Sequence, residues 1–356
     1  MRVLLVSVKS EIQKGGIAVW TEQYLRGCKQ NGIEVSLVNT EAIGKIAINS
    51  TGRRNFKDEF LRCYKISKQL NEQLKKNRYD IVHFNTSIGF FGIIRDYYLI
   101  KRIVKSGLPV ILHFHCDIPF WITNSVVKYY LKKTLKLTSK NVVLCNNSRQ
   151  YLKNEFKVES DIIPNFLEQR LVIHKKSIRQ NIRQVCFVGR VSIEKGAKEL
   201  FEVADMFSEI EFKFAGEVTK EVSEWKKPQN IELLGAISHD KIINLLDESD
   251  VFLFLSHSEG FSLALLESMA RGLPSIVTDV GANRDMLNGC GGRVIQVGDI
   301  EATKKAIEEM QDSALRYNMS LWNIEKVCNN YTIEKVVQEL NEKYGRIVEE
   351  NKCQYM

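Results

Sequence analysis

The sequence predicts an α/β protein made of two doubly wound parallel sheets, each covered by helices. Short apolar runs alternate with amphipathic stretches along the 356 residues, which is typical of parallel sheets with helical crossovers. Each half of the chain opens in the same way, with a buried strand, a glycine turn and a helix. Because the length exceeds that of one typical domain, we expect two domains.

The first half of the chain contains five apolar runs with the length of buried strands. These expected strands are Val3–Val8, Val35–Val38, Asp80–Phe84, Pro109–His115 and Asn141–Asn146. Helical periodicity lies between them, at Lys57–Lys75 and Phe91–Lys105. After the first strand, Gly15 and Gly16 open an amphipathic helix, and their lack of side chains would let a ligand approach the helix end. A plain turn is the competing interpretation of this glycine pair.

Charge is unevenly distributed, and the first half is basic. Residues 1–170 hold 28 Lys and Arg against 14 Asp and Glu, a net +14, whereas the other 186 residues hold 23 against 29, a net −6. A basic half admits an anionic partner, either nucleic acid or an anionic membrane surface, and we expect the membrane rather than nucleic acid. Residues 124–140 read as a basic amphipathic helix, for which a domain helix with a solvated lysine face is the alternative. The candidate membrane residues are Phe120, Trp121, Lys128, Lys132 and Lys136.

The second half repeats the alternation of strands and helices. Val185–Gly189, Phe212–Gly216 and Ile231–Gly235 are apolar runs that each end in glycine. The helical patterns of this half are Ala197–Phe207, Ser238–Asp247, Glu301–Met310 and a long final helix capped by Thr332. The chain is organised around residues 250–298, where Val251–Leu255, a helix from Ser262 and Ser275–Thr278 form a strand–helix–strand unit.

Two glutamates in this central stretch are candidate ligand-binding residues. Glu259 lies in the loop after the strand, and Glu267 follows eight positions later, near the face that opens the helix. Between them, the Gly260–Leu263 backbone offers N–H groups at a positive helix end, which suits an anion. Two carboxylates beside such an end could bind the hydroxyls and oxygens of a sugar phosphate. Two solvated helix charges are the alternative.

The string Glu-Gly-Phe-Ser-Leu-Ala-Leu-Leu-Glu at 259–267, with the Asp279–Asp285 segment after it, resembles the E-x7-E region of retaining glycosyltransferases of family 4. The resemblance implies the GT-B fold, in which two Rossmann-like domains face one another across a cleft. The implied parts are an N-terminal acceptor-side domain over 1–166, a linker over 167–183, a C-terminal nucleotide-sugar domain over 184–331, and a last helix over 332–356 that returns to the first domain.

The resemblance also implies roles for residues of the second half. Glu259 would hold the hydroxyls of the donor sugar, and Glu267 would hold the ribose. Arg190 and Lys195 match the family's G-R-x4-K-G element, whose two bases hold the leaving diphosphate. The backbone at Gly260, Phe261, Ser262 and Leu263 would share that diphosphate, and Gly216 and Leu234 would wall the nucleoside pocket.

In the first half, the resemblance implies that Gly15 and Gly16 approach the donor diphosphate. His115 ends the segment that resembles V-V-x-T-x-H, where a histidine meets the donor sugar or its phosphate, and we expect His113 to be a core group. The candidate sugar or acceptor residues are Asn85, which stands where the family often has a second histidine, Asp117, which could orient His115, and Asn165. Phe166 replaces the glycine usual after Asn165, so a different turn is expected there.

Composition limits the cofactors and the location. The eight cysteines form no CxxC pair and share no spacing with histidines, so we expect no metal site and a reduced, cytoplasmic environment. No apolar run is long enough to span a bilayer, which leaves peripheral association with the inner face of the membrane as the expected membrane contact.

The sequence therefore predicts a hexosyltransferase that moves a sugar from a nucleotide diphosphate sugar to a hydroxyl acceptor, with retention and without a metal. The acceptor is expected in surface polysaccharide or glycolipid synthesis, where it could be lipid-linked. Two alternatives remain open at this point, a GT-B sugar-nucleotide epimerase and a non-catalytic binder of sugar nucleotides or polyanions. A dehydrogenase is disfavoured because no G-x-G-x-x-G follows either opening strand.

Overall fold

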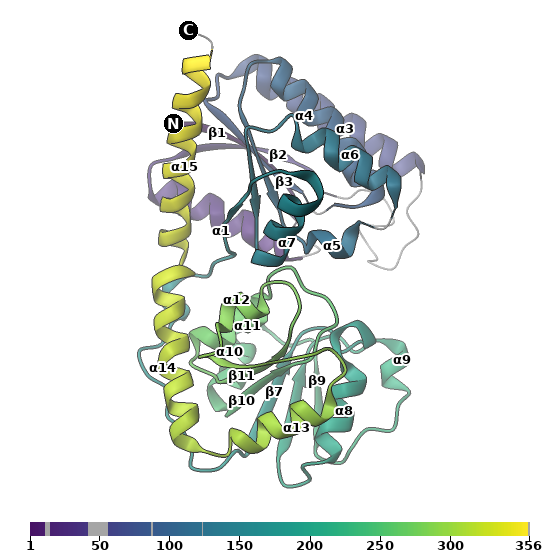
Figure 1. Ribbon diagram of the computed structural model, residues 1–356, viewed down its shortest axis with the longest axis vertical. Helices are drawn as coiled ribbons and strands as arrows, with labels where there is room; N and C mark the ends of the chain where they lie inside the picture. The colour runs from purple at the N-terminus through teal and green to yellow at the C-terminus, as the bar shows by residue number, and fades with distance from the viewer. Residues whose placement is uncertain (11–14, 42–55, 87, 123, 355–356) are drawn as a thin grey trace. The chain divides into compact units, whose positions relative to one another are not determined.

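The computed structural model describes residues 1–10, 15–41, 56–86, 88–122 and 124–354. The chain divides into two compact units, of which the first combines Met1–Asn165 with Ile333–Met356 and the second is Phe166–Thr332. In the described residues, each unit contains a parallel six-stranded sheet with helices packed around it (Figure 1). This architecture confirms the predicted α/β fold with two doubly wound sheets.

The sheet of the first unit has the strand order β2-β1-β3-β4-β5-β6, with every pair parallel. Its strands are β1 Arg2–Ser7, β2 Glu34–Asn39, β3 Ile81–Thr86, β4 Val110–Phe114, β5 Lys140–Val143 and β6 Asp161–Ile162. Its helices are α1 Gly16–Gln30, α3 Phe56–Lys76, α4 Phe90–Lys105, α5 Ile118–Trp121, α6 Ser125–Leu135, α7 Asn146–Tyr151 and α15 Ile333–Gln354.

Alternation along the strands of the first unit separates an apolar layer from a polar one. On β3, Val82 and Phe84 belong to the apolar core that the sheet shares with α3, α4 and α6. His83, which lies between them in sequence, faces the opposite layer, where its ring contacts Tyr24 of α1 and Tyr344 of α15. Because side chains of a strand alternate between faces, this register places Asn85 in the same layer as His83.

The last helix of the chain, α15, packs against α1 of the first unit (Figure 1). Gly27 allows this close contact, because a Cβ at that position would lie 2.8 Å from a side-chain carbon of Ile333. The two helices also share a hydrogen bond between the hydroxyls of Tyr24 and Tyr344, 2.7 Å apart and buried.

The sheet of the second unit has the order β12-β11-β10-β7-β8-β9, again with parallel pairs. Its strands are β7 Gln184–Val188, β8 Glu211–Ala215, β9 Ile231–Gly235, β10 Val251–Phe254, β11 Ser275–Thr278 and β12 Gly292–Ile295. Its helices are α8 Ala197–Asp205, α9 Lys220–Ser223, α10 His239–Glu248, α11 Leu263–Ala270, α12 Asn283–Leu287, α13 Ile300–Glu309 and α14 Ser313–Asn330.

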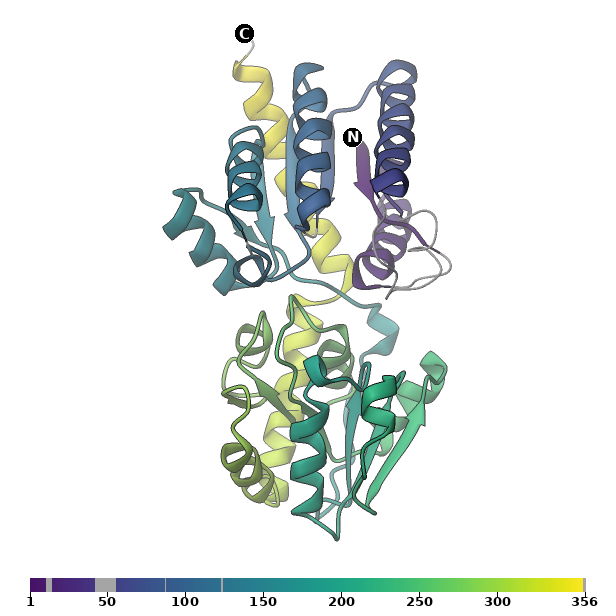
Figure 2. The same cartoon turned by 90° about the vertical axis from the view of Figure 1, so that its right-hand side faces the viewer.

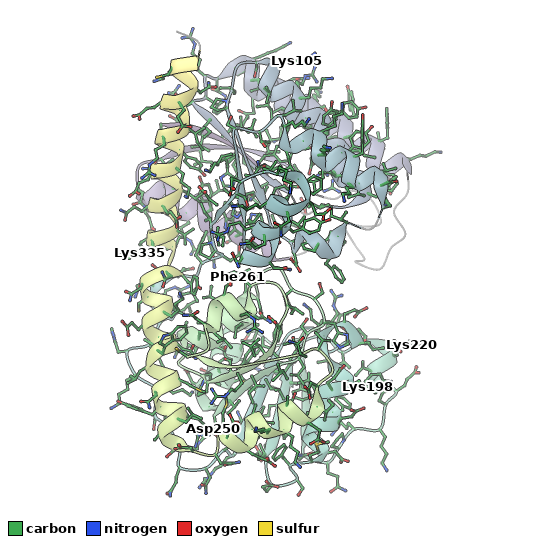
Figure 3. The ribbon with its side chains drawn as sticks, in the orientation of Figure 1. Lys105, Lys198, Lys220, Asp250, Phe261 and Lys335 are labelled. Carbon is green, nitrogen blue, oxygen red and sulfur yellow. The ribbon has the colours of Figure 1, made fainter. Side chains whose placement is uncertain are left out.

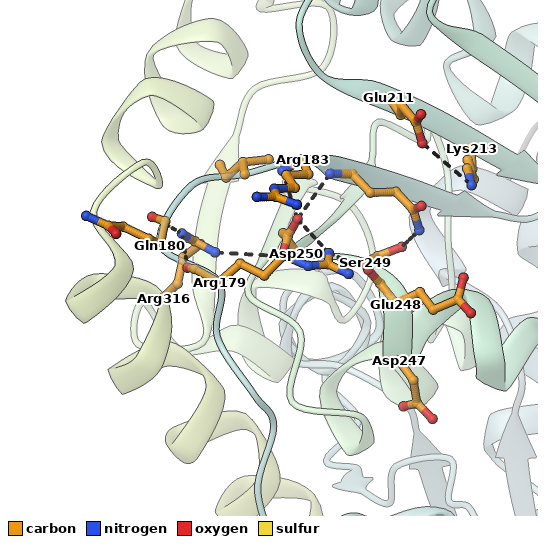
Figure 4. Close-up of polar contacts among 12 residues, drawn as sticks. Arg179, Gln180, Arg183, Glu211, Lys213, Asp247, Glu248, Ser249, Asp250 and Arg316 are labelled. Carbon is orange, nitrogen blue, oxygen red and sulfur yellow. Dashed lines mark hydrogen bonds and ion pairs between the residues drawn. The ribbon is translucent and has the colours of Figure 1, made fainter.

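The segment 167–183, expected as a linker, makes hydrogen bonds with several residues of the second unit. Arg179 donates to the Glu248 carbonyl and to the Asp250 carboxylate (Figure 4). The buried Asp250 carboxylate also accepts from the backbone N–H groups of Arg183, at 2.8 Å, and Gln184, at 3.1 Å. Arg316 of α14 lies 3.9 Å from the same carboxylate and donates to the carbonyls of residues 179 and 180.

Candidate functional site

Three loops converge at the carboxyl edge of the second sheet. The strand order reverses direction between β10 and β7, and ligands of doubly wound sheets bind at such a switch point. The loop after β7 is tied to the loop after β10, because the His257 N–H donates to the Glu194 carbonyl at 2.9 Å. The loop after β11 joins them, since the Ala282 N–H donates to the Gly260 carbonyl at 3.0 Å.

At this switch point Lys195 and Glu259 form an ion pair with an N–O distance of 2.5 Å. Lys195 ends the single 3-10 turn after β7, and Glu259 comes from the loop after β10. Their side chains are only 30% and 12% exposed, so solvent screens this pair less than an ordinary surface pair. The two residues predicted to hold the diphosphate and the donor sugar therefore lie side by side. Arg190, the other predicted base, is exposed in the same loop.

The start of α11 has the capped geometry that the sequence predicts. Ser262 is the N-cap, and its hydroxyl accepts from the Leu265 N–H at 3.2 Å. Phe261 is buried and packs edge-on against Tyr331, which fixes the backbone just before the helix. The positive end of α11, at Gly260–Leu263, thus opens at the edge of the sheet where Lys195 lies.

Gly281 holds the Glu259 loop in place, a role that no pattern in the sequence indicates. Its φ of +54° lies in the left-handed region, and a Cβ there would lie 2.2 Å from the Glu259 carbonyl oxygen. Only glycine satisfies both conditions at once. The close approach of the two loops therefore depends on this position.

Glu267 has a partner, His239, that its motif does not predict. Its carboxylate lies 3.0 Å from Nε2 of His239, the first residue of α10. The hydrogen bond to Glu267 raises the pKa of His239 above its usual value. A signal was present in the sequence, because α10 follows β9 and helices that follow parallel strands begin at the carboxyl edge. The pair could bind a ribose, with carboxylate and imidazole both available to hydroxyls.

The ends of β7, β8 and β9 form a tight glycine-lined wall. The Gly189 N–H donates to the Ala215 carbonyl at 2.9 Å, and the Gly216 N–H donates to the Gly235 carbonyl at 2.8 Å. A Cβ on Gly216 would lie 1.9 Å from the Gly189 carbonyl oxygen, and the φ of Gly216 is +145°. Leu234 is half-buried on the last of these strands. The wall offers backbone rather than side-chain contacts, which suits a flat base.

The first unit has its own reversal of strand order, between β1 and β3. Gly15 and Gly16 begin α1 there, exposed, and an added Cβ would meet no atom within 4 Å. Asn85 at the end of β3 donates to the Ser7 hydroxyl at 2.9 Å, which orients its amide. Its buried Oδ1 has no hydrogen-bond partner among the described residues. That acceptor could take a ligand hydroxyl.

His115 follows β4 in a cluster of buried rings. Its ring centroid lies 4.1 Å from that of His113 and 5.0 Å from that of Trp20. Burial lowers the pKa of His115 to about 3, so the imidazole is neutral at pH 7. Its Nε2 has no hydrogen-bond partner in the described part of the chain. A neutral imidazole can exchange a hydrogen bond with a sugar hydroxyl or phosphate without adding charge.

Asp117 was expected to orient His115, and the structure corrects this. Its carboxylate accepts hydrogen bonds from the Ser148 hydroxyl at 3.0 Å and the Asn147 amide at 3.1 Å. Because α7 begins beside it, Asp117 fixes the start of that helix. His113, expected in the core, is buried with its Nδ1 3.3 Å from Nε2 of His83. Asn165 is buried at the end of the first of the two segments that make up the first unit.

The candidate membrane residues lie on α5 and α6. Phe120 and Trp121 are 57% and 44% exposed, while Lys128 pairs with Glu155 at 2.7 Å. The helix ends at Leu135 instead of reaching residue 140, because Lys140 already belongs to β5, and so Lys136 is its C-cap. No helix in the described residues is long and apolar enough to cross a bilayer.

Two Rossmann-like domains, with polar groups at the carboxyl edge of each sheet, define the GT-B class of transferases. Residues 14–169 match the family described as Glycosyltransferase Family 4, and residues 169–321 match Glycosyl transferases group 1. The chain belongs to family 4 of the glycosyltransferases. Of the functions that the sequence left open, glycosyl transfer is therefore the one that the family supports.

Curated relatives cover most of this chain. A UDP-Gal:alpha-D-GlcNAc-diphosphoundecaprenol alpha-1,3-galactosyltransferase of Escherichia coli is 26% identical, over 77% of each chain. An N-acetyl-alpha-D-glucosaminyl L-malate synthase of Bacillus anthracis is 22% identical, over 81% of this chain and 80% of its own. A further relative, from Staphylococcus aureus, is named as a capsular polysaccharide biosynthesis glycosyltransferase and is 29% identical over 34% of this chain and 32% of its own.

Solved structures agree on the fold. Sucrose-phosphate synthase from Thermosynechococcus elongatus matches with a TM-score of 0.79 and 16% identity, over 97% of this chain and 98% of its own. Anabaena HepE, solved with UDP and glucose, matches with a TM-score of 0.72 and 14% identity, over 97% and 100%.

Proposed function

We propose that this glycosyltransferase moves a sugar from a nucleoside diphosphate sugar to a hydroxyl, with retention at the anomeric carbon. The observation that carries the proposal is the Lys195–Glu259 ion pair at the switch point of the second sheet. A lysine there suits the donor diphosphate, and a carboxylate suits the hydroxyls of the donor sugar. Donor binding would then replace the Lys195–Glu259 ion pair with two contacts to one ligand, Lys195 to its diphosphate and Glu259 to its sugar.

The hard step of such a transfer is charge developing on the departing diphosphate. Lys195, Arg190 and the positive end of α11 would neutralise that charge in a preorganised way. Glu259 would orient the sugar instead of attacking it. The acceptor would attack from the face that the diphosphate leaves, with the leaving phosphate as its base. On this proposal, Lys195 and Arg190 neutralise the diphosphate charge that a bound metal ion could otherwise neutralise.

The donor class is tested by thermal shift with UDP, GDP, ADP and sugar donors of each. A ligand at about 100 times its Kd adds about 2.7 kcal/mol of stability. We expect one nucleotide to raise the Tm and Glu267→Ala to abolish that shift. UDP is the first candidate, because the E. coli relative is named for UDP-Gal and HepE was solved with UDP. No shift with any nucleotide would contradict the proposal.

Metal independence and retention have separate tests. Transfer should continue at an unchanged rate after EDTA treatment, and a rate restored only by added Mg²⁺ or Mn²⁺ would overturn metal independence. Proton NMR of the first product should show the anomeric configuration of the donor. An inverted product would rule out same-face attack and leave the donor site intact.

We also propose that α5 and α6 bring the protein to an anionic membrane, where a lipid-linked acceptor would be available. The exposed rings of Phe120 and Trp121 on α5 and the exposed Lys132 and Lys136 of α6 and its C-cap support this, although Glu155 offsets the charge of Lys128. We expect co-sedimentation with vesicles containing phosphatidylglycerol and not with pure phosphatidylcholine. Equal binding to both, or to neither, would contradict it.

A further inference from the structure

A groove of about 740 Å³ lies between α3 and α4 of the first unit. Figure 2 shows α4 between α3 and α6, and it packs closely against α6 but only sparsely against α3. The sparse packing leaves the groove open along several turns of both helices. Its volume is in the range of small-molecule sites, and nothing in the proposed transfer reaction uses it.

One end of this groove is apolar. Phe60 of α3 and Phe91, Ile94, Tyr98 and Leu99 of α4 line it. Phe60 is 74% exposed and Tyr98 is 58% exposed, so two large rings border the groove without completing the core. Contiguous exposed apolar surface of this kind marks a binding surface more often than a plain solvent face.

The other end of the groove is basic. Lys101, Arg102 and Lys105, in the last turns of α4, line it, and Figure 3 shows Lys105 near the end of that helix. A second pocket of about 390 Å³ shares Ser67 and Arg102 with the groove and extends it along α3. The further charged residues of this extension are Lys68, Lys75 and Glu72.

The remaining charges of the groove are already compensated. Arg95 pairs with the buried Asp96 at 2.6 Å, and Glu59 is buried and 3.5 Å from Arg62. Lys101 lies over the Tyr97 ring, and among the described residues no ion pair neutralises Lys101, Arg102 or Lys105, so their charge is available to an anionic ligand. An amphiphile with one apolar chain and an anionic head matches both ends at once.

We propose that the α3–α4 groove binds an anionic phospholipid, with an acyl chain along the apolar end and the phosphate at the basic end. A second copy of this chain fits less well, because it would bring equal positive charge to a half that already carries +14. The orientation also assigns the lipid a role. The apolar end lies at the start of α4, just after β3 and Asn85, so the phosphate sits at the opposite edge of the sheet. The groove therefore holds an anchoring lipid, and the acceptor binds elsewhere.

The test uses the full chain and short-chain lipids below their critical micelle concentrations, with binding measured by calorimetry. Dioctanoyl phosphatidylglycerol should bind saturably, and dioctanoyl phosphatidylcholine should bind at least tenfold more weakly. Phe60→Ser and the triple variant Lys101→Gln, Arg102→Gln, Lys105→Gln should each weaken binding at least tenfold. A matched triple variant in the second unit, Lys198→Gln, Lys220→Gln, Lys226→Gln, should bind as wild type does.

Equal affinity for the two lipids, no saturable binding, or unchanged binding in the groove variants would overturn the inference. Dimerisation of the wild type that Phe60→Ser abolishes would overturn it in favour of a second copy. The Tm shift caused by nucleotides should be the same in all these variants. That readout separates the groove from the transfer site, since either can fail while the other is retained.

Discussion

At the scale of single residues, the candidate site is a set of side chains that compensate one another before any ligand binds. Lys195 neutralises Glu259, and His239 shares a hydrogen bond with Glu267. Such pairing avoids leaving a partly buried charge uncompensated, which is costly. It also means that each predicted ligand contact must replace an existing one.

Removing Glu259 should therefore impair transfer strongly. We expect Glu259→Gln to lower kcat/KM by a factor of about 100 to 1000, since one preorganised contact contributes roughly 3–4 kcal/mol to transition-state stabilisation. Glu202→Gln, which removes the carboxylate of a surface pair with Lys198, is the matched control and should retain wild-type kinetics. Steady-state rates of the two variants decide the matter, and a Glu259→Gln enzyme within threefold of wild type would remove the assigned role.

Gly281 should tolerate substitution poorly, because it supports the loop that carries Glu259. Gly281→Ala places a Cβ 2.2 Å from the Glu259 carbonyl oxygen at a φ of +54°, so the loop must move. We expect a loss of about 1–3 kcal/mol in the free energy of unfolding and a clear fall in kcat/KM. Gly289→Ala has a φ of +72° but open space around its Cβ, so it should lose stability without losing activity. Equal losses of activity in Gly281→Ala and Gly289→Ala would mean that backbone strain alone, and not the close approach to Glu259, lowers the activity.

At the scale of elements, periodicity in the sequence was sufficient for most strands and helices but missed α14. The strands with continuous apolar runs, such as β7 and β10, were predicted within one or two residues. The buried face of α14 mixes the polar Arg316, Ser320 and Asn323 with apolar residues, so its apolar stripe is interrupted. Asn323 donates to the carbonyls of Leu273 and Gly291, contacts that only the folded chain creates.

The same limit explains why the side-chain pairs of the candidate site could not be predicted from the sequence. Motif spacing pointed to Glu259 and Lys195, each within its own loop, but no local pattern pairs residues 64 positions apart. The pairing of Asn85 with Ser7 and of Glu267 with His239 is equally long-range. Asp117 was assigned to His115 from nearness in sequence, whereas the fold brings α7 closer.

The carboxylate of Asp250, just before β10, should be central to the stability of the second unit. Asp250 is 4% exposed and holds Arg179 and two backbone N–H groups (Figure 4). Asp250→Ala leaves these donors and the buried Arg316 without their anion, so we expect a loss of about 3–5 kcal/mol. Glu309→Ala, which breaks the half-exposed pair with Arg293, should cost less than about 1 kcal/mol.

Hydrogen exchange of the β7 and β10 amides measures the loss of unfolding free energy in both variants, because these amides exchange when the second unit unfolds. Similar protection in the two variants would show that the Asp250 network contributes little beyond an ordinary surface pair.

At the scale of the whole molecule, the two units differ in how they respond to acid. His83 and His113 are buried in the first unit and His115 is half-buried, and the rings of all three contact Trp20. Burial lowers the pKa of His83 and of His115 to about 3, and that of His113 well below its usual value. In the second unit, the hydrogen bond to Glu267 raises the pKa of the half-exposed His239, which has the opposite consequence.

The first unit should therefore lose stability as the pH falls below 6.5. Between pH 6.5 and about 3 the unfolded chain binds protons at these histidines and the folded chain does not, so the free energy of unfolding decreases with falling pH. Each such histidine contributes a slope of up to about 1.4 kcal/mol per pH unit. Exchange of the β3 and β4 amides at pH 7.0, 6.0 and 5.0 measures this slope against that of β7 and β10. His113→Asn removes one titrating group, so its slope should be shallower whatever its stability at pH 7.0. Parallel pH profiles in the two units, or an unchanged slope in His113→Asn, would show that the buried ring cluster does not govern acid sensitivity.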